Sequence, residues 1–174
     1  MTYLSEGVAG KHAETLKEND PLLNNCHNIS IGNNSLTLKA SSEMAIALGY
    51  RTTIVSDSLQ TSTSVAAQQI VDIAKEILMV NKGEKLCLLF KGEPTIQVIG
   101  TEKGGRNLHL VMLVTNLLKD SRNYTFLSCV TDGTDGTTAV AGAVCDFDTL
   151  VQVDQQNIDI KDYIKKNNSL IFFM

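Results

Sequence analysis

The sequence predicts an α/β fold in which a mixed or parallel sheet is flanked by helices. Segments of strand pattern alternate along the chain with segments of helical pattern, and this order is typical of the class. The composition agrees, since 43% of the 174 residues are hydrophobic and 20% are charged, as in globular proteins that bury a sizeable core. Crossovers between parallel strands are expected to be right-handed.

The predicted strands are short segments rich in β-branched or apolar residues. Residues 27–32 (HNISIG) alternate apolar and polar side chains, which indicates a short strand. Residues 84–90 (EKLCLLF) form an apolar run that predicts burial on both faces. Residues 94–100 (PTIQVIG) follow closely enough to pair with that run or to lie beside it. Further strands are predicted at 50–56 and 124–130, whereas 137–146 is ambiguous.

Three longer segments have the period of an α-helix. Residues 33–49 can be capped by Asn34 or Ser35 and end at Gly49. Residues 62–80 repeat the pattern, and residues 106–120 form a strongly apolar helix. Shorter helical segments are expected at 5–17 and 160–174. The apolar faces predicted for the first two long helices are Leu36, Ala40, Met44, Ala47 and Leu48, and Ile70, Ile73, Ala74, Ile77 and Leu78.

Charge and cysteine spacing argue against several classes of protein. The net charge of −4 provides no electrostatic reason to expect a nucleic-acid partner. The cysteines are too widely spaced for a zinc site, and Cys87 and Cys129, which lie in apolar runs, are predicted to be buried thiols in a reducing compartment. The apolar runs are too short to span a membrane, and the first residues match no signal or transit peptide. We therefore expect a cytoplasmic protein.

One candidate site lies in the loop GTEKGGRN (100–107), between a predicted strand and a predicted helix. Gly104 and Gly105 allow the backbone to approach a ligand closely, and the helix that follows presents free N–H groups. Arg106 adds a planar guanidinium that suits a carboxylate or a phosphate. The alternative is a glycine-rich turn with a solvated arginine.

A second candidate site is the doubled Asp-Gly loop TDGTDG (131–136), which directly follows a predicted strand. In α/β sheets, ligands gather beyond the carboxyl ends of the strands. Asp132 and Asp135 can direct two carboxylates into one space, as a Mg²⁺ site requires, and the loop amides can bind an anion. The alternative is two consecutive turns in which each Asp is a local cap.

Two other polar residues are weaker candidates. Glu93 is either a strand-end carboxylate near the site or a solvated turn residue. His109 lies one turn into an apolar helix, so we expect a packed histidine rather than a catalytic base. The sequence contains no Walker A motif, no GxGxxG motif and no kinase HRD motif.

Several motifs occur in the order and spacing of the type II glycerate kinases, the glycerate 2-kinase family. The motifs KGEPTIQVIG, KGGRN, TDGTDGTTAVAGAVCD and YIKKNNSLIFF are similar to the carboxy-terminal region of that family, the MOFRL domain. The stretch at 13–50 resembles the end of the family's first domain. The resemblance therefore covers nearly the whole chain.

The resemblance implies a two-domain enzyme that transfers the γ-phosphoryl group of ATP to D-glycerate, with Mg²⁺, and gives 2-phosphoglycerate. Residues 1–83 would be the end of the first, Rossmann-like domain and residues 84–174 the MOFRL-like domain, with the active site in the cleft between domains. By motif, Arg106 would be catalytic, and Asp132 and Asp135 would bind the metal. The resemblance assigns substrate or phosphate binding to Glu93, Gly104, Gly105, Asn107, Gly133 and Gly136.

The chain also departs from the family pattern. Ala139 stands where the family has an acidic residue, and Leu108 and His109 stand where it has Gln-Glu. Most of the first domain has no counterpart, and the chain stops on the apolar run SLIFFM, so we expect a fragment or short isoform that is inactive alone. D-glycerate is the expected partner, without nucleic acid or membrane, while a homo-oligomer and a longer mitochondrial isoform are left open. The alternative function is a non-catalytic α/β module that binds an anionic metabolite or a partner protein.

Overall fold

The computed structural model describes residues 2–99 and 101–174. The chain divides into two compact units, Met1–Asn33 and Asn34–Met174. The first unit contains α1 (Thr2–Val8) and one turn of 3-10 helix, η1 (Pro21–Leu23). Within the described residues, no helix is long and apolar enough to cross a membrane.

Two predictions for the first unit are wrong. The helix predicted at 5–17 is replaced by α1, which begins and ends earlier, and residues 27–32 form no strand. Ile29 and Ile31 are 81% and 95% exposed. The alternating pattern of this segment suits a strand, but a strand also needs a neighbour that satisfies its backbone groups and covers its apolar side chains. No such neighbour occurs among the described residues of the unit.

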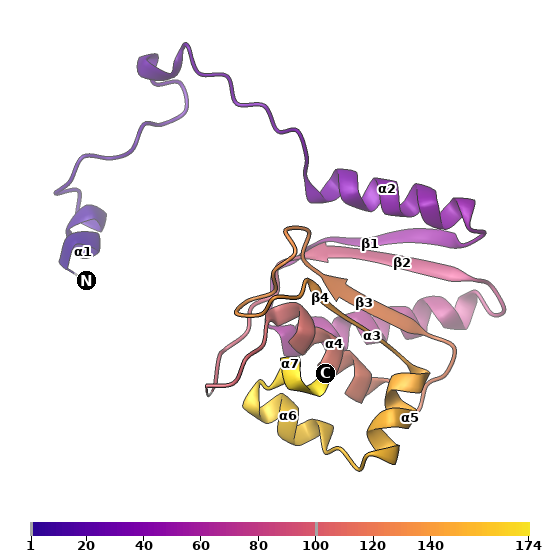
Figure 1. Ribbon diagram of the computed structural model, residues 1–174. Helices are drawn as coiled ribbons and strands as arrows, with labels where there is room; N and C mark the ends of the chain where they lie inside the picture. The colour runs from indigo at the N-terminus through magenta and orange to yellow at the C-terminus, as the bar shows by residue number, and fades with distance from the viewer. Residues whose placement is uncertain (1, 100) are drawn as a thin grey trace. The chain divides into compact units, whose positions relative to one another are not determined.

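The second unit is a mixed α/β structure, which confirms the predicted fold class (Figure 1). Its described strands form a parallel pair, β1–β2, and an antiparallel pair, β3–β4. Figure 1 shows α2 on one side of β1 and β2, with α3 and α4 on the other side. The elements are, in order, α2 (Asn34–Ala47), β1 (Arg51–Leu59), α3 (Thr63–Val80), β2 (Leu86–Gly92), α4 (Arg106–Leu117), β3 (Thr125–Cys129), β4 (Gly142–Asp146), α5 (Phe147–Gln155), α6 (Ile160–Lys166) and α7 (Ser169–Phe172).

The hydrophobic core lies where α3 and α4 pack together. Ala66 and Ala67 of α3 are completely buried, and their small side chains allow α4 to approach closely. Half-buried side chains from the sheets, such as Phe90 and Phe126, cover this contact. Because β1 precedes the predicted domain boundary at 83/84 and β2 follows it, the two predicted domains share one sheet in this chain. The boundary itself stays a prediction about the family's domain organisation.

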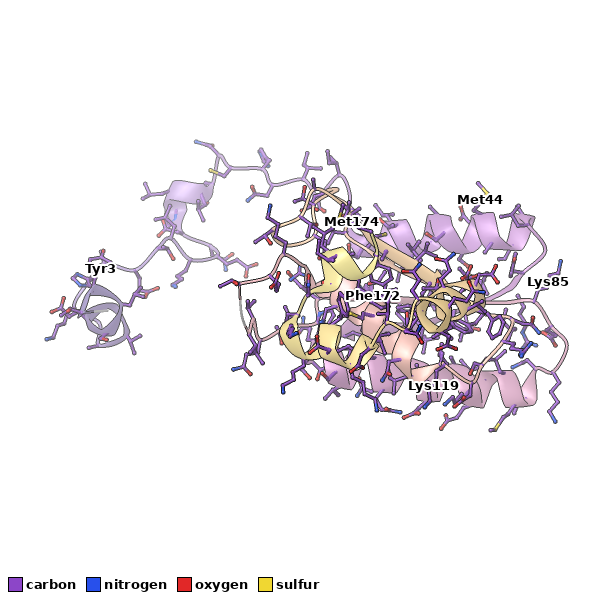
Figure 2. All side chains as sticks on the ribbon, turned by 60° about the horizontal axis from the view of Figure 1, so that its bottom comes forward. Tyr3, Met44, Lys85, Lys119, Phe172 and Met174 are labelled. Atoms are coloured by element: carbon purple, nitrogen blue, oxygen red, sulfur yellow. The ribbon has the colours of Figure 1, made fainter. Side chains whose placement is uncertain are left out.

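The sequence predicted the wrong face of α2 as the buried one. Leu36, Met44 and Leu48 are 54%, 63% and 66% exposed, and Figure 2 shows Met44 pointing away from the rest of the unit. The half-buried positions are Leu38, Ser42 and Ala45. A hydrogen bond of 2.7 Å joins the hydroxyls of Ser42 and Thr52, so α2 contacts the sheet through the side that carries Leu38, Ser42 and Ala45 rather than through the predicted face.

Three further predictions about apolar segments are corrected by the structure. β2 is half-buried along Leu86–Lys91 rather than buried on both faces. The segment 94–99 forms no strand and makes only one bridge, between Thr95 and Ser62, while Gly100 lies outside the described residues. Cys129 is exposed and Cys87 is half-buried, because each lies on a side of its strand that the packed helices do not fully cover.

The helix α5 was not predicted, although its start has a clear local signal. Asp146 accepts a hydrogen bond from the Thr149 N–H at 3.0 Å, and the Asp146 N–H donates to Thr149 Oγ1 at 3.2 Å. This reciprocal pair is a capping box, which satisfies two backbone groups at the helix start. The hydrogen bonds that the Asp146 carboxylate accepts from the Thr149 N–H and the Thr149 hydroxyl lower the pKa of Asp146.

We expect Asp146→Ala to destabilise the protein by about 1 kcal/mol, because the first turn of α5 loses its cap. Asp146→Asn is the matched control, since an amide oxygen still accepts from Thr149 and the loss should be much smaller. Urea unfolding at neutral pH measures both free energies. Equal losses for the two variants would show that the cap is not what holds α5.

Candidate functional site

The structure brings the two candidate loops together at one edge of the second unit. Figure 1 shows β2 and β3 ending on the same side, where the β3–β4 loop also lies. The Thr137 N–H donates to the Gly104 carbonyl oxygen at 3.3 Å. A Cβ added to Gly136 would lie 2.6 Å from the same oxygen, so the Asp-Gly loop packs directly on the Gly-Gly loop.

Asp135 is the centre of this contact. The residue is completely buried, and its carboxylate accepts hydrogen bonds from the backbone N–H of Asn107 (3.2 Å), the backbone N–H of Leu108 (2.9 Å) and the Asn107 side-chain amide (3.0 Å). These backbone groups belong to the first turn of α4, where the helix has unsatisfied donors and a partial positive charge. Asp135 is therefore a cap for α4 supplied by a loop 28 residues further along the chain.

The glycines of both loops permit this close packing. A Cβ on Gly105 would lie 2.2 Å from Asp135 Cγ, and one on Gly104 would lie 2.5 Å from Ser169 Oγ. Gly136 has φ of +62°, a conformation that side chains disfavour, in addition to its contact with Gly104. Gly133 has φ of +88° but no atom within 4 Å of an added Cβ. Three of the four glycines thus serve contacts between loops, and the ligand-binding role predicted for all four stays a prediction.

The α4 N-terminus is not the open anion site that the sequence suggested. The N–H groups of Asn107 and Leu108 already donate to Asp135, and Gly105 is in contact with the same carboxylate. An external phosphate would have to displace a buried carboxylate to reach them. The charged group that remains for a ligand at the start of α4 is the side chain of Arg106.

Arg106 is the first residue of α4 and forms an ion pair with Glu93. The Nη1–Oε1 distance is 2.8 Å, and the two side chains are 37% and 70% exposed. Exposed ion pairs contribute little to stability, so this pair orients the guanidinium without shielding it from a ligand. Glu93 contacts the arginine with its negative charge, and its predicted role in phosphate binding stays a prediction.

Asn107 uses its side-chain amide entirely within the protein. Its Nδ2 donates to Asp135 Oδ1, and its Oδ1 accepts from Ser128 Oγ at 2.7 Å. The side chain therefore links α4, β3 and the Asp-Gly loop. This network supports a structural function for Asn107, while the predicted substrate contact stays a prediction.

The two aspartates of the loop have very different surroundings. Asp132 is exposed and accepts a hydrogen bond from the Thr134 N–H at 3.3 Å, the local turn that the sequence analysis gave as its alternative. The buried carboxylate of Asp135 already has three donors. Among the described residues, no group of three or more His, Cys, Asp or Glu side chains could hold a metal ion. This donor set does not suit Mg²⁺, so the geometry favours capping, and the metal role stays a prediction.

Lys91 is a cation at this edge that the sequence analysis did not single out. Its Nζ donates to Ser35 Oγ at 3.1 Å, in the first turn of α2. Lys91 lies near the end of β2, two residues before Glu93, which pairs with Arg106, so two cations lie near that strand end. Its position directly before the Gly-Glu-Pro-Thr motif was the sequence feature from which Lys91 could have been predicted to lie near the site.

A hollow of about 450 Å³ lies between α6 and the first residues of the 100–107 loop, before its two glycines. It is lined by Ile99, Thr101, Glu102, Asp162, Lys165 and Lys166, none of which was a predicted site residue. The 2.6 Å ion pair between Lys166 and Asp162 neutralises much of its charge. The candidate site therefore remains the edge with Arg106.

His109 is buried, as the sequence analysis expected. The side chain is 5% exposed, and Nδ1 has no hydrogen-bond partner. Burial disfavours the charged imidazolium and lowers the pKa of His109 below 6.5. The histidine is thus neutral in the folded protein at neutral pH.

We expect His109 to make the protein less stable in mild acid. Below pH 6.5 the imidazole of His109 is protonated in the unfolded chain but stays neutral in the folded chain until a lower pH. The free energy of unfolding therefore decreases as the pH drops, by up to about 1.4 kcal/mol per pH unit. Urea unfolding between pH 7.5 and 5 should therefore show a smaller slope for His109→Leu than for the parent. His27→Leu changes an exposed histidine and is the control. Equal slopes for the parent and His109→Leu would contradict the prediction.

Comparison with known proteins agrees with this geometry. Residues 86–174, which include both loops, match the model of the MOFRL family. A glycerate 2-kinase from Pyrococcus horikoshii is 31% identical over 170 residues, covering 96% of this chain and 38% of that protein. A crystal structure of a protein from Pyrococcus horikoshii OT3 covers 99% of this chain with a TM-score of 0.76 at 30% identity.

A crystal structure of glycerate kinase from Thermotoga maritima also has a TM-score of 0.76, at 30% identity. That match covers 82% of this chain and 35% of the bacterial one. The chain therefore spans less than two fifths of the length of each of these proteins. Within that span both the sequence and the fold agree, and the chain belongs to the MOFRL family of glycerate kinases.

Proposed function

We propose that this chain forms one wall of the active site of an ATP-dependent glycerate 2-kinase, with Arg106 as its catalytic residue. The observation that carries the proposal is the guanidinium of Arg106, which is partly exposed at the start of α4 and held by Glu93. Membership of the glycerate kinase family supports ATP as phosphoryl donor and D-glycerate as acceptor.

Phosphoryl transfer depends on positioning and on stabilising negative charge, and little other chemistry is required of the protein. The planar fork of Arg106 can hold two oxygens of a phosphate or a carboxylate. An incoming anion would compete with the Glu93 carboxylate for the guanidinium, which is possible because that pair is exposed. Lys91 adds positive charge near the same strand end and favours an anionic ligand.

The loops contribute rigidity to this wall. The contact of Gly104, Gly105 and Gly136 with one another and with Asp135 fixes the backbone from which Arg106 extends. Mg²⁺ would supply further charge neutralisation to the transferring phosphate, but the carboxylates of this loop do not build a site for it. The proposed chemistry of this wall therefore rests on Arg106.

The chain alone is proposed to be inactive as a kinase. It spans less than half the length of the glycerate kinases it matches, and a transfer reaction needs groups that position both the donor and the acceptor. A cytoplasmic location is part of the proposal, as the sequence analysis expected.

We expect the purified chain to make no 2-phosphoglycerate from ATP and D-glycerate above a buffer control. Effective positioning of two reactants can remove about 7–11 kcal/mol of barrier, and half of a site provides little of that. A complete glycerate kinase from the same family is the positive control. Turnover by the chain alone would contradict this prediction, whereas D-glycerate binding without turnover in any longer form would favour the non-catalytic binding module.

We expect Arg106→Lys to impair a complete enzyme that carries this half, because a lysine keeps the charge and loses the two-pronged geometry. A fall in kcat with little change in KM for D-glycerate would place Arg106 on the transferring phosphoryl group. A rise in KM with kcat preserved would place it on the glycerate carboxylate. Unchanged kcat and KM, or a lowered melting temperature as the only defect, would show that Arg106 is structural.

A further inference from the structure

The carboxyl group of Asp135 is completely buried, and none of the ion pairs among the described residues includes it. Burying an unpaired carboxylate is unfavourable unless hydrogen bonds and dipoles replace its water. Here two backbone N–H groups and one side-chain amide replace it, at the positive end of a twelve-residue helix. The carboxylate and the first turn of α4 therefore stabilise each other.

The loop that carries Asp135 is itself held in place at several points. The Asp135 N–H donates to the Val140 carbonyl oxygen at 2.8 Å, and Thr138 Oγ1 donates to the Asp135 carbonyl oxygen at 2.7 Å. On the other side, Gly105 leaves no room for any side chain against the carboxylate. The carboxylate can thus adopt only a narrow range of positions.

Arg106 lies between two residues that contact this carboxylate, Gly105 and Asn107. Gly105 before it is in van der Waals contact with Asp135, and Asn107 after it donates two hydrogen bonds to Asp135. The backbone of Arg106 is consequently held from both sides, while its guanidinium reaches Glu93. Contacts with Asp135 thus fix the backbone from which the Arg106 side chain extends, and the ion pair with Glu93 fixes the position of its guanidinium.

We propose that Asp135 is a positioning residue for Arg106: through the first turn of α4 it aims the guanidinium at the anion that this edge binds. Asn107 and Ser128 extend the same network to β3. The inference rests on the proposed anion-binding role of Arg106, but it makes a separate claim about where the guanidinium points. Asp135 would affect ligand binding without touching the ligand.

The test measures the guanidinium and the ligand separately, on the full chain. The Arg106 Nε–H signal in a nitrogen–proton NMR spectrum is identified by its loss in Arg106→Lys, and binding is measured by titration with inorganic phosphate. In Asp135→Asn, one acceptor oxygen becomes a donor that faces other donors, so the Arg106 signal should move toward that of a freely solvated arginine. Phosphate affinity should fall by about tenfold, since small misplacements of binding groups have effects of this size or larger.

Two variants distinguish positioning from general damage. Asp154→Asn changes an exposed aspartate of α5, outside both loops, and should leave both readouts unchanged. Adding Asn107→Asp to Asp135→Asn reverses the amide–carboxylate pair and keeps an acceptor for Ser128, so it should restore the Arg106 signal and most of the affinity.

A folded Asp135→Asn chain with an unchanged Arg106 signal would overturn the proposal. If that variant does not fold, Ser128→Ala removes one hydrogen bond from Asn107 and must move the Arg106 signal in the same direction; no movement again overturns the proposal. A parent chain that binds no phosphate, but whose Arg106 signal responds to Asp135→Asn, would reject the proposed function and retain the positioning role.

Discussion

The buried carboxylate of Asp135 against the first turn of α4 is the interaction on which the candidate site depends. It joins two loops that are far apart in the sequence and gives each its shape. The tight packing of Gly104, Gly105 and Gly136 is a consequence, since any side chain at these positions would collide with a loop atom. The doubled Asp-Gly motif thus supplies one aspartate to a local turn and the other to a remote helix.

This arrangement determines what remains for a ligand. The free backbone N–H groups at a helix start commonly bind an anionic ligand. In this protein the side chain of Asp135 accepts their hydrogen bonds instead. External ligands are left with side chains, namely Arg106, Lys91 and Glu93 at the end of β2. An edge with charged side chains on a closely packed base suits the proposed phosphoryl transfer, a reaction governed by positioning and charge stabilisation.

The hydrophobic core and the candidate site share the helix α4. The helix α4 is buried along most of its length against α3 and the sheets, and its first residue carries the candidate catalytic side chain. His109, one turn further along, has an unsatisfied nitrogen in the same buried helix. In contrast, none of the described residues 2–33 is buried, and α2 exposes its most apolar face. The buried residues among those described therefore lie in the part that matches the MOFRL family, together with α3.

The sequence by itself determined the fold class, the long helices α3 and α4 and the strands β1, β2 and β3, because hydrophobic period and glycine punctuation are local signals. It also held enough motif order to indicate the glycerate kinase family, and a capping box at Asp146 that marks α5. Tertiary structure alone decided that residues 27–32 form no strand and that α2 turns Leu38, Ser42 and Ala45 toward the sheet instead of the predicted face, because both depend on which surface lies opposite. Only the tertiary structure showed that Asp135 caps α4, because the N–H groups that donate to its carboxylate are 27 and 28 residues away in the chain.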